Sequence, residues 1–137
     1  MKKINSILAI GLSACLITCT AFAAAPANMS VDNNTYLISN AYMHDAPTSV
    51  PVGPKSFALI PWSEVTTFCH GSSMSGSDSC AFDVYATSDG ANPKQIHVAT
   101  VTFYLSNGEF VNIKQLALQY GLKLAAVAPG KIELDNV

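Results

Sequence analysis

The sequence contains no arginine, and this absence narrows the range of partners. Bidentate hydrogen bonding to phosphate or carboxylate is mainly arginine's role, because lysine offers only a point charge. Behind the basic head of the chain, the remaining lysines are scattered along the sequence, at positions 55, 94, 114, 123 and 131. They form no basic stripe that could follow a nucleic-acid backbone. The sequence therefore predicts a protein that binds neither nucleic acid nor an anionic membrane surface.

Long apolar runs are also scarce, and the one sustained run lies at the start of the chain. It extends from about Ile7 to Phe22 behind Lys2 and Lys3, and Ala21-Phe22-Ala23 has the small-x-small pattern that signal peptidases cut. A membrane-spanning helix needs roughly 20 apolar residues, which is more than this run supplies. We therefore expect residues 1–23 to be a cleaved signal peptide. The protein would be exported to the periplasm or the medium, with no transmembrane anchor after processing.

A lipid anchor is the less favoured alternative. Leu12-Ser13-Ala14-Cys15 resembles the lipobox of bacterial lipoproteins, in which the cysteine is acylated. Apolar residues follow at Leu16, Ile17 and Phe22, where lipoproteins usually carry a polar tether. This context disfavours lipidation through Cys15.

Removal of the signal leaves 114 of the 137 residues, with five lysines against nine acidic residues and a formal charge of −4. A chain of this size fits one compact domain. Residues 24–34 are small and polar without clear periodicity, which predicts a flexible leader. Residues 35–137 are then the single, β-rich domain.

Two of the four cysteines remain after processing, Cys69 and Cys80. They flank the Ser/Gly-rich segment 70–79, and export to an oxidising compartment favours a disulfide over a metal site or a redox switch. The pattern predicts a hairpin that is closed by a disulfide, with the cysteines at two strand ends. Closing a loop of this size stabilises a small domain by about 3 kcal/mol.

β-prone runs alternate with turn-forming residues along the domain. Asn107-Gly108 between two such runs favours a two-residue type I′ hairpin that places Leu105 opposite Phe110. The proline-rich segment 44–55 is expected to be a connecting loop or an irregular edge. We expect strands at 35–43, 56–60, 65–69, 80–87, 96–105, 110–113, 122–127 and 131–134.

One short helix is expected over 113–120, because four residues there have helical spacing: Ile113, Leu116, Ala117 and Tyr120. Asn112 suits an N-cap, and Gly121 suits the left-handed residue after a helix. The predicted fold class is therefore α+β, mainly antiparallel sheet with this one helix. If 113–120 is a strand, the alternative is an all-β sandwich or small barrel.

The sequence shows no catalytic or metal-binding motif. His44, His70 and His97 lack metal-ligand spacing, and no Gly-x-Ser-x-Gly motif occurs. Asp78 and Asp83 could approach each other across a hairpin, but they lack the dense pattern of a calcium loop. We expect no enzyme, no cofactor and no metal. A small hydrolase whose site forms only in three dimensions is a lesser alternative.

The remaining features favour a small exported, non-catalytic binding protein that acts through its loops. Its partner would be an unidentified protein or envelope component. A structural or assembly component of the bacterial envelope or a secretion machine, using an exposed strand edge, is the alternative. A lone tryptophan is by default a core anchor, but near a loop it can instead be a contact residue. The candidate contact residues are Trp62, His70, Met74 and Asp78.

Overall fold

The computed structural model describes residues 24–43, 45–48, 51–70 and 78–137. The predicted signal peptide, Cys15 and Met74 lie outside the described residues. Within these ranges the strands and helices follow in this order: β1 Asn28–Asn33, β2 Ile38–Met43, β3 Ala46–Pro47, β4 Ser56–Pro61, α2 Trp62–His70, β5 Ser79–Thr87, β6 Ile96–Tyr104, β7 Phe110–Gln115, the 3-10 helix η2 Leu118–Tyr120, β8 Leu122–Ala128 and β9 Lys131–Asn136.

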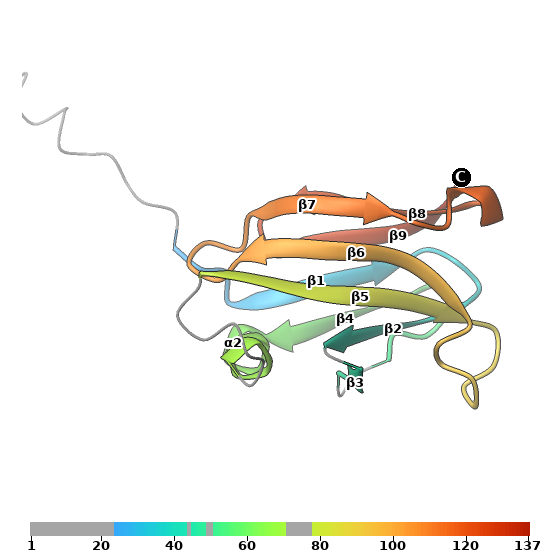
Figure 1. The fold of residues 1–137 in the computed structure, drawn as a ribbon, viewed down its shortest axis with the longest axis horizontal. Helices are drawn as coiled ribbons and strands as arrows, with labels where there is room; N and C mark the ends of the chain where they lie inside the picture. Colours follow the sequence, from blue (N-terminus) through green and yellow to red (C-terminus); the bar gives the residue numbers. More distant parts are fainter. Residues whose placement is uncertain (1–23, 44, 49–50, 71–77) are drawn as a thin grey trace, which may run out of the picture.

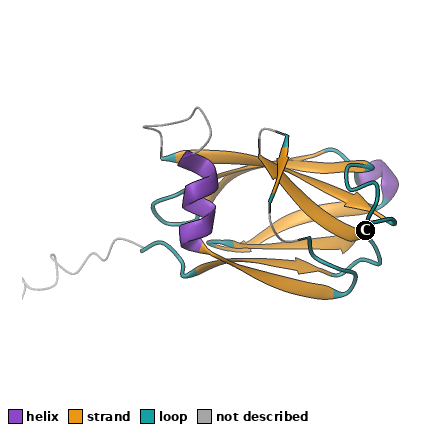
Figure 2. Cartoon of the chain, turned by 90° about the horizontal axis from the view of Figure 1, so that it is seen from below, coloured by secondary structure: helices purple, strands orange, loops and turns teal. Residues whose placement is uncertain are grey.

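The strands form two sheets that face each other (Figure 1). The four-stranded sheet has the order β4-β1-β9-β8, and the five-stranded sheet has the order β3-β2-β5-β6-β7. All neighbouring strands are antiparallel except β1 and β9, which are parallel. The described strands thus form a sandwich of two separate sheets and not a closed barrel. Helix α2 lies across one end of the gap between the two layers (Figure 2).

Alternating side chains from both sheets fill the space between the layers. Phe103 on β6 is fully buried and is the centre of an aromatic cluster. Its ring lies 5.8 Å from that of Trp62, 5.6 Å from Phe82 and 6.2 Å from Phe110, measured between ring centroids. Leu124 and Leu134 are likewise fully buried from the opposite sheet. The hydrophobic core therefore includes residues of both sheets and of the N-terminal end of α2.

The segment expected to be a flexible leader contains strand β1, so that expectation is wrong for Asn28–Asn33. Met29, Val31 and Asn33 point inward in strict alternation and are buried. β1 lies between β4 and β9 and is a central strand of its sheet. The alternation of buried and exposed residues was not recognised in the sequence, because one inward position is an asparagine and the neighbouring residues are small and polar.

Among the described residues the α-helix is α2 at Trp62–His70, in a segment where the sequence predicts a strand at 65–69. The β-branched residues of this segment favour strand by propensity. Three residues with helical spacing, Trp62, Val65 and Cys69, are buried on one face, so tertiary packing overrides propensity. Glu64 in the first turn also complements the positive end of the helix dipole.

The helix expected over 113–120 does not form. Residues up to Gln115 continue β7, where Ile113 pairs with Val101 and Gln115 pairs with Ala99. Only the short 3-10 turn η2 follows, and Tyr120 is exposed instead of packing on the sheet. Gly121 does adopt the expected left-handed conformation, with φ of 73°. The part of the chain that the structure describes is a β-sandwich whose α-helix, α2, lies elsewhere than predicted.

The β6–β7 hairpin exists, but its register differs from the predicted one. Phe110 pairs with Phe103 and not with Leu105. Gly108 alone takes positive φ in this turn, at 75°, so the two-residue type I′ turn is replaced by a longer one. Gly108 N donates to Tyr104 O at 2.8 Å and so closes the turn. A Cβ at Gly108 would lie 2.9 Å from Pro26, which further restricts this position to glycine.

Candidate functional site

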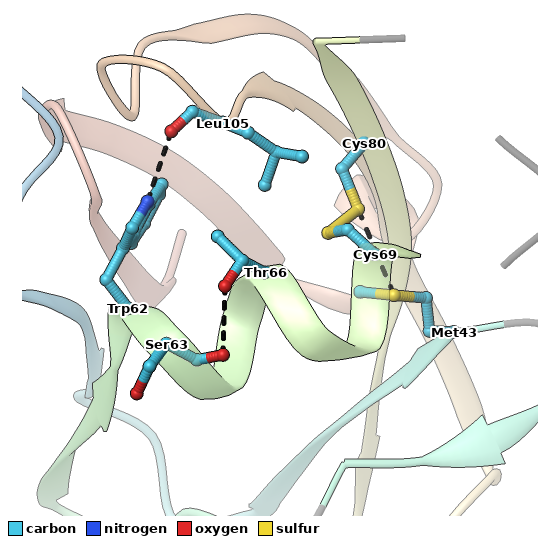
Figure 3. Close-up of a disulfide and its surroundings, with 7 residues drawn as sticks. All are labelled: Met43, Trp62, Ser63, Thr66, Cys69, Cys80 and Leu105. Carbon is cyan, nitrogen blue, oxygen red and sulfur yellow. Dashed lines mark hydrogen bonds between the residues drawn. A yellow bond between two sulfur atoms is a disulfide. The ribbon is translucent and has the colours of Figure 1, made fainter. Parts of the chain in front are cut away.

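Trp62 fixes the start of α2 to both sheets. Its indole Nε1 donates to Leu105 O at 3.1 Å (Figure 3). Its backbone N donates to Ala27 O at 3.0 Å. The side chain is only 8% exposed and packs edge-on against Phe103. Trp62 is therefore a core anchor, and the contact role considered for it does not fit this burial.

The Cys69–Cys80 disulfide fixes the other end of α2. The pairing agrees with the prediction, but the bridge joins a helix to the start of β5 and not two strands of a hairpin. The Cα atoms lie 5.8 Å apart, and Met43 Sδ lies 3.9 Å from Cys80 Sγ (Figure 3). The helix is thus attached to the five-stranded sheet at both of its ends.

Asp78 fixes the neighbouring turn 105–108. Its carboxylate accepts from Ser106 N at 2.9 Å and from Ser106 Oγ at 2.6 Å, and its backbone O accepts from Leu105 N at 2.8 Å. Leu105 also accepts the Trp62 hydrogen bond through its own carbonyl. Three segments, α2, the start of β5 and the 105–108 turn, are therefore joined at one end of the sandwich. We call this region the helical end.

The helical end contains all the candidate residues that the structure describes. His70 is exposed in the last turn of α2, and Asp78 is exposed while bound to Ser106. Ser63, Thr67 and His70 form an exposed stripe at helical spacing, opposite the buried face of α2. Met74 lies outside the described residues. The helical end therefore presents a polar helix surface beside the carboxylate of Asp78.

A second polar cluster, on the outer face of the five-stranded sheet, was not found from the sequence. Asp83 Oδ1 accepts from Thr100 Oγ1 at 2.7 Å and lies 3.0 Å from His97 Nε2. The His97 ring stacks on Tyr85 with centroids 4.5 Å apart. Between β5 and β6 the register shifts near Val84 and Tyr85, and this bulge turns both His97 and Thr100 outward.

Lys94 and Asp45 extend the same cluster toward β2. Lys94 Nζ lies 2.9 Å from Asp45 Oδ1 and 4.5 Å from the centroid of the Tyr42 ring. The hydrogen bond that Lys94 donates to the Asp45 carboxylate raises the pKa of Lys94 above its ordinary value, and burial opposes this only in part. Tyr42 in turn packs edge-on against Tyr85 at 5.3 Å. The cluster therefore attaches two connecting segments to the sheet.

Neither region has the geometry of a nucleophilic relay. In such a relay the histidine takes the proton from the nucleophile, and the carboxylate only orients the histidine. Here Thr100 donates to Asp83 and not to His97. Asp78 and Asp83, considered as a weak calcium pair, bind separate partners. Among the described residues no three His, Cys, Asp or Glu side chains gather as a metal site.

The helices in the described part of the chain are all too short or too polar to cross a bilayer. 

The chain matches a known protein family and resembles a solved structure. A family model described as the T2SS substrate NttC matches residues 1–136. The chain is similar to the crystal structure of the Legionella pneumophila type II secretion system substrate NttC, with 26% identity and a TM-score of 0.69. That likeness covers 82% of this chain and 100% of the other. No curated protein matches.

Proposed function

This chain belongs to the NttC family of type II secretion system substrates, and we propose that it works after export as a non-catalytic binding protein. Family membership makes it a protein exported beyond the cytoplasm. We propose an export route in two steps. Residues 1–23 direct passage into the periplasm, and the folded protein then reaches the medium. Release without a lipid on Cys15 is the form expected outside the cell.

We assign partner contact to the helical end. The observation that carries this proposal is the joining of α2, Asp78 and the 105–108 turn by a disulfide and side-chain hydrogen bonds. A surface held in one conformation loses less entropy on binding than a loose loop would. The exposed stripe Ser63, Thr67 and His70 lies on this fixed element.

A non-catalytic role is supported by the way the polar side chains are used. The carboxylates of Asp78 and Asp83 are each engaged in hydrogen bonds that hold a turn or a sheet face. His97 shares Asp83 with Thr100 and stacks on Tyr85. These contacts give structural roles to the groups that a hydrolase would need to keep free.

An assembly role is the second candidate, and the exposed edge of the four-stranded sheet favours it. β4 pairs only with β1 among the described strands, and it exposes Phe57 by 66% and Leu59 by 55%. An uncharged edge strand with exposed apolar side chains can accept a strand from another protein. In this alternative the contact would follow β4 and not the helical end.

Paired variants separate the two candidates. Thr67→Arg with His70→Glu changes the exposed face of α2, and Leu59→Lys changes the β4 edge. Both are compared with Lys123→Glu on the exposed side of β8. The measurement is cross-linking of purified secreted protein to its native host surface and medium, followed by identification of the captured protein.

Loss of one discrete cross-linked partner only in the α2 variant would support the binding proposal. Loss only in the β4 variant would support assembly through the strand edge. Unchanged capture of the partner by both variants would show that neither the helical end nor the β4 edge is the contact surface. Each variant is first checked for an unchanged thermal transition, so that misfolding is not scored as lost contact.

A further inference from the structure

The two edges of the four-stranded sheet differ in how they are protected from further strands. At the β8 edge, the Gln115 amide bonds the backbone of Leu124, and Lys123 supplies a charge. Occupied backbone groups and lysine side chains are devices that keep a sheet edge from accepting another strand. The β4 edge has neither device, because Ser56–Pro61 contains no charged residue and pairs only with β1 among the described strands.

The backbone groups that β4 leaves open belong to Phe57 and Leu59. Trp62 N donates to Ala27 O at 3.0 Å, in continuation of the β1–β4 register. Hydrogen-bonded pairs alternate along an antiparallel ladder, so the even-numbered residues of β4 bond β1 and the odd-numbered ones face the open edge. Phe57 and Leu59 therefore each present an N–H and a C=O at this edge, and both also expose their apolar side chains.

We propose that β4 pairs with β4 of a second copy of this chain, antiparallel and about a two-fold axis at Ala58. This register places Phe57 opposite Leu59 of the second copy, and symmetry repeats the pair on the other side of the axis. Each of these pairs exchanges two hydrogen bonds, so all the open backbone groups of Phe57 and Leu59 are used. The two four-stranded sheets then form one continuous sheet.

The two ends of β4 select this register. Pro61 lies opposite Lys55 of the second copy, and Pro61 has no N–H to donate. Lys55 N already donates to Thr35 O of its own chain at 2.9 Å, so no bond is lost where these two residues meet. An axis at Leu59 would instead set Phe57 opposite Pro61 and leave the Phe57 carbonyl without a donor. A slip by one residue would set outward side chains against inward ones.

Charge and side-chain matching favour a second copy as the occupant of this edge. Because β4 is uncharged, two copies of it meet without the repulsion that like charges on facing strands produce. Phe57 and Leu59, which are exposed in the single chain, cover each other across the pair as an aromatic–aliphatic contact. The contact is small, so the dimer is expected to be weak and to form as the concentration rises. This inference names the partner in the second proposed function, rests on that function, and does not involve the helical end.

Amide hydrogen exchange of the mature protein, followed by NMR from dilute to concentrated solution, tests the pairing without any substitution. The N–H groups of Phe57 and Leu59 should become protected as the concentration rises. Those of Ala58 and Ile60, which bond β1 within one chain, should keep the same protection and are the internal control. Sedimentation velocity over the same range should show a growing dimer. A monomer throughout, or a dimer whose newly protected amides lie outside β4, would overturn the proposal.

Charged variants test the register. Phe57→Glu and Leu59→Lys each set a charge opposite an apolar side chain in both symmetric pairs, and each should weaken dimerisation about tenfold. Combining the two changes in one chain sets the new carboxylate opposite the new ammonium group of the second copy, which should restore most of the dimer. Lys123→Glu on the exposed side of β8 is the control and should dimerise like the unchanged protein. A combined variant no better than the single ones would overturn this register.

Failure of self-pairing can be told apart from failure of the assembly function. A protein that stays monomeric while Leu59→Lys loses a cross-linked host protein would show that β4 accepts a foreign strand, and self-pairing would be wrong. A concentration-dependent dimer through β4, with host capture unchanged in Leu59→Lys, would support self-pairing and contradict assembly with a host component.

Discussion

The side-chain amide of Gln115 pairs with the backbone of Leu124 as a neighbouring strand would. Leu124 N donates to Gln115 Oε1 at 3.0 Å, and Gln115 Nε2 donates to Leu124 O. Gln115 ends β7 in one sheet, and Leu124 lies on β8 at the edge of the other. One side chain therefore links the two sheets at this edge.

Replacement of Gln115 by alanine should destabilise the domain by about 2 kcal/mol. The change leaves two polar groups of the fully buried Leu124 without partners, and each unsatisfied buried group costs on the order of 1–3 kcal/mol. Equilibrium denaturation by urea measures the loss. Gln119→Ala in the exposed η2 turn is the control and should change stability by less than about 0.5 kcal/mol. Equal losses in the two variants would contradict the role of the Gln115 amide.

Asn33 should be far more important than its neighbour Asn34. The buried Asn33 amide donates to Leu37 O at 2.6 Å and to Gly53 O at 3.0 Å, and it accepts from Thr35 Oγ1 at 2.7 Å. Asn34 makes one exposed side-chain bond, to Asp135. We expect Asn33→Ala to cost about 3 kcal/mol and Asn34→Ala about 0.5 kcal/mol or less. Thermal unfolding of both variants tests this, and similar midpoints would refute the difference.

The disulfide should stabilise the protein by holding α2 on the five-stranded sheet. The paired change Cys69→Ser with Cys80→Ser should lower stability by about 3 kcal/mol, as expected for a bridge across 11 positions. Chemical denaturation of the variant is compared with that of the unchanged protein, reduced and oxidised. Free thiols detected in the native, oxidised protein would show that the bridge does not form.

Local sequence signals located β5, β6 and the start of β7, and the positions of the turns between them, because alternation and turn residues act over short distances. They failed for α2, since Val65, Thr66 and Thr67 are strand-forming by propensity. What makes this segment helical is the burial of Trp62 and Cys69 on one face, and the partner surfaces come from distant parts of the chain.

The polar cluster of Asp83, His97 and Thr100 was hidden for a different reason. Strict alternation along β6 puts His97 and Thr100 on opposite faces, and only the bulge opposite Val84 brings them to the same face. A bulge depends on pairing between two strands and has no clear single-sequence signal. The disulfide, by contrast, was predictable because export and the cysteine count left one pairing.

The Lys94–Asp45 pair gives a prediction about pH. Its hydrogen bond raises the pKa of Lys94 above 10.5, and the Tyr85 and Tyr42 side chains add smaller contributions in the same direction. The folded protein thus keeps this proton to a higher pH than the unfolded chain does. Any stabilisation from the pair is fully present below pH 10.5 and is lost as pH rises through the raised pKa.

NMR titration of the Lys94 side chain measures this pKa directly. Asp45→Asn should return it toward the ordinary lysine value, because the variant amide can still be near Nζ but has no negative charge. Asp89→Asn is the matched control, since Asp89 lies in the same 88–95 connection but bonds Ala91 N instead of Lys94. If Asp89→Asn lowered the Lys94 pKa as much as Asp45→Asn did, the cause would be the loss of a nearby negative charge and not the hydrogen bond to Asp45. An unchanged pKa in Asp45→Asn would show that the pair does not hold Lys94 in solution.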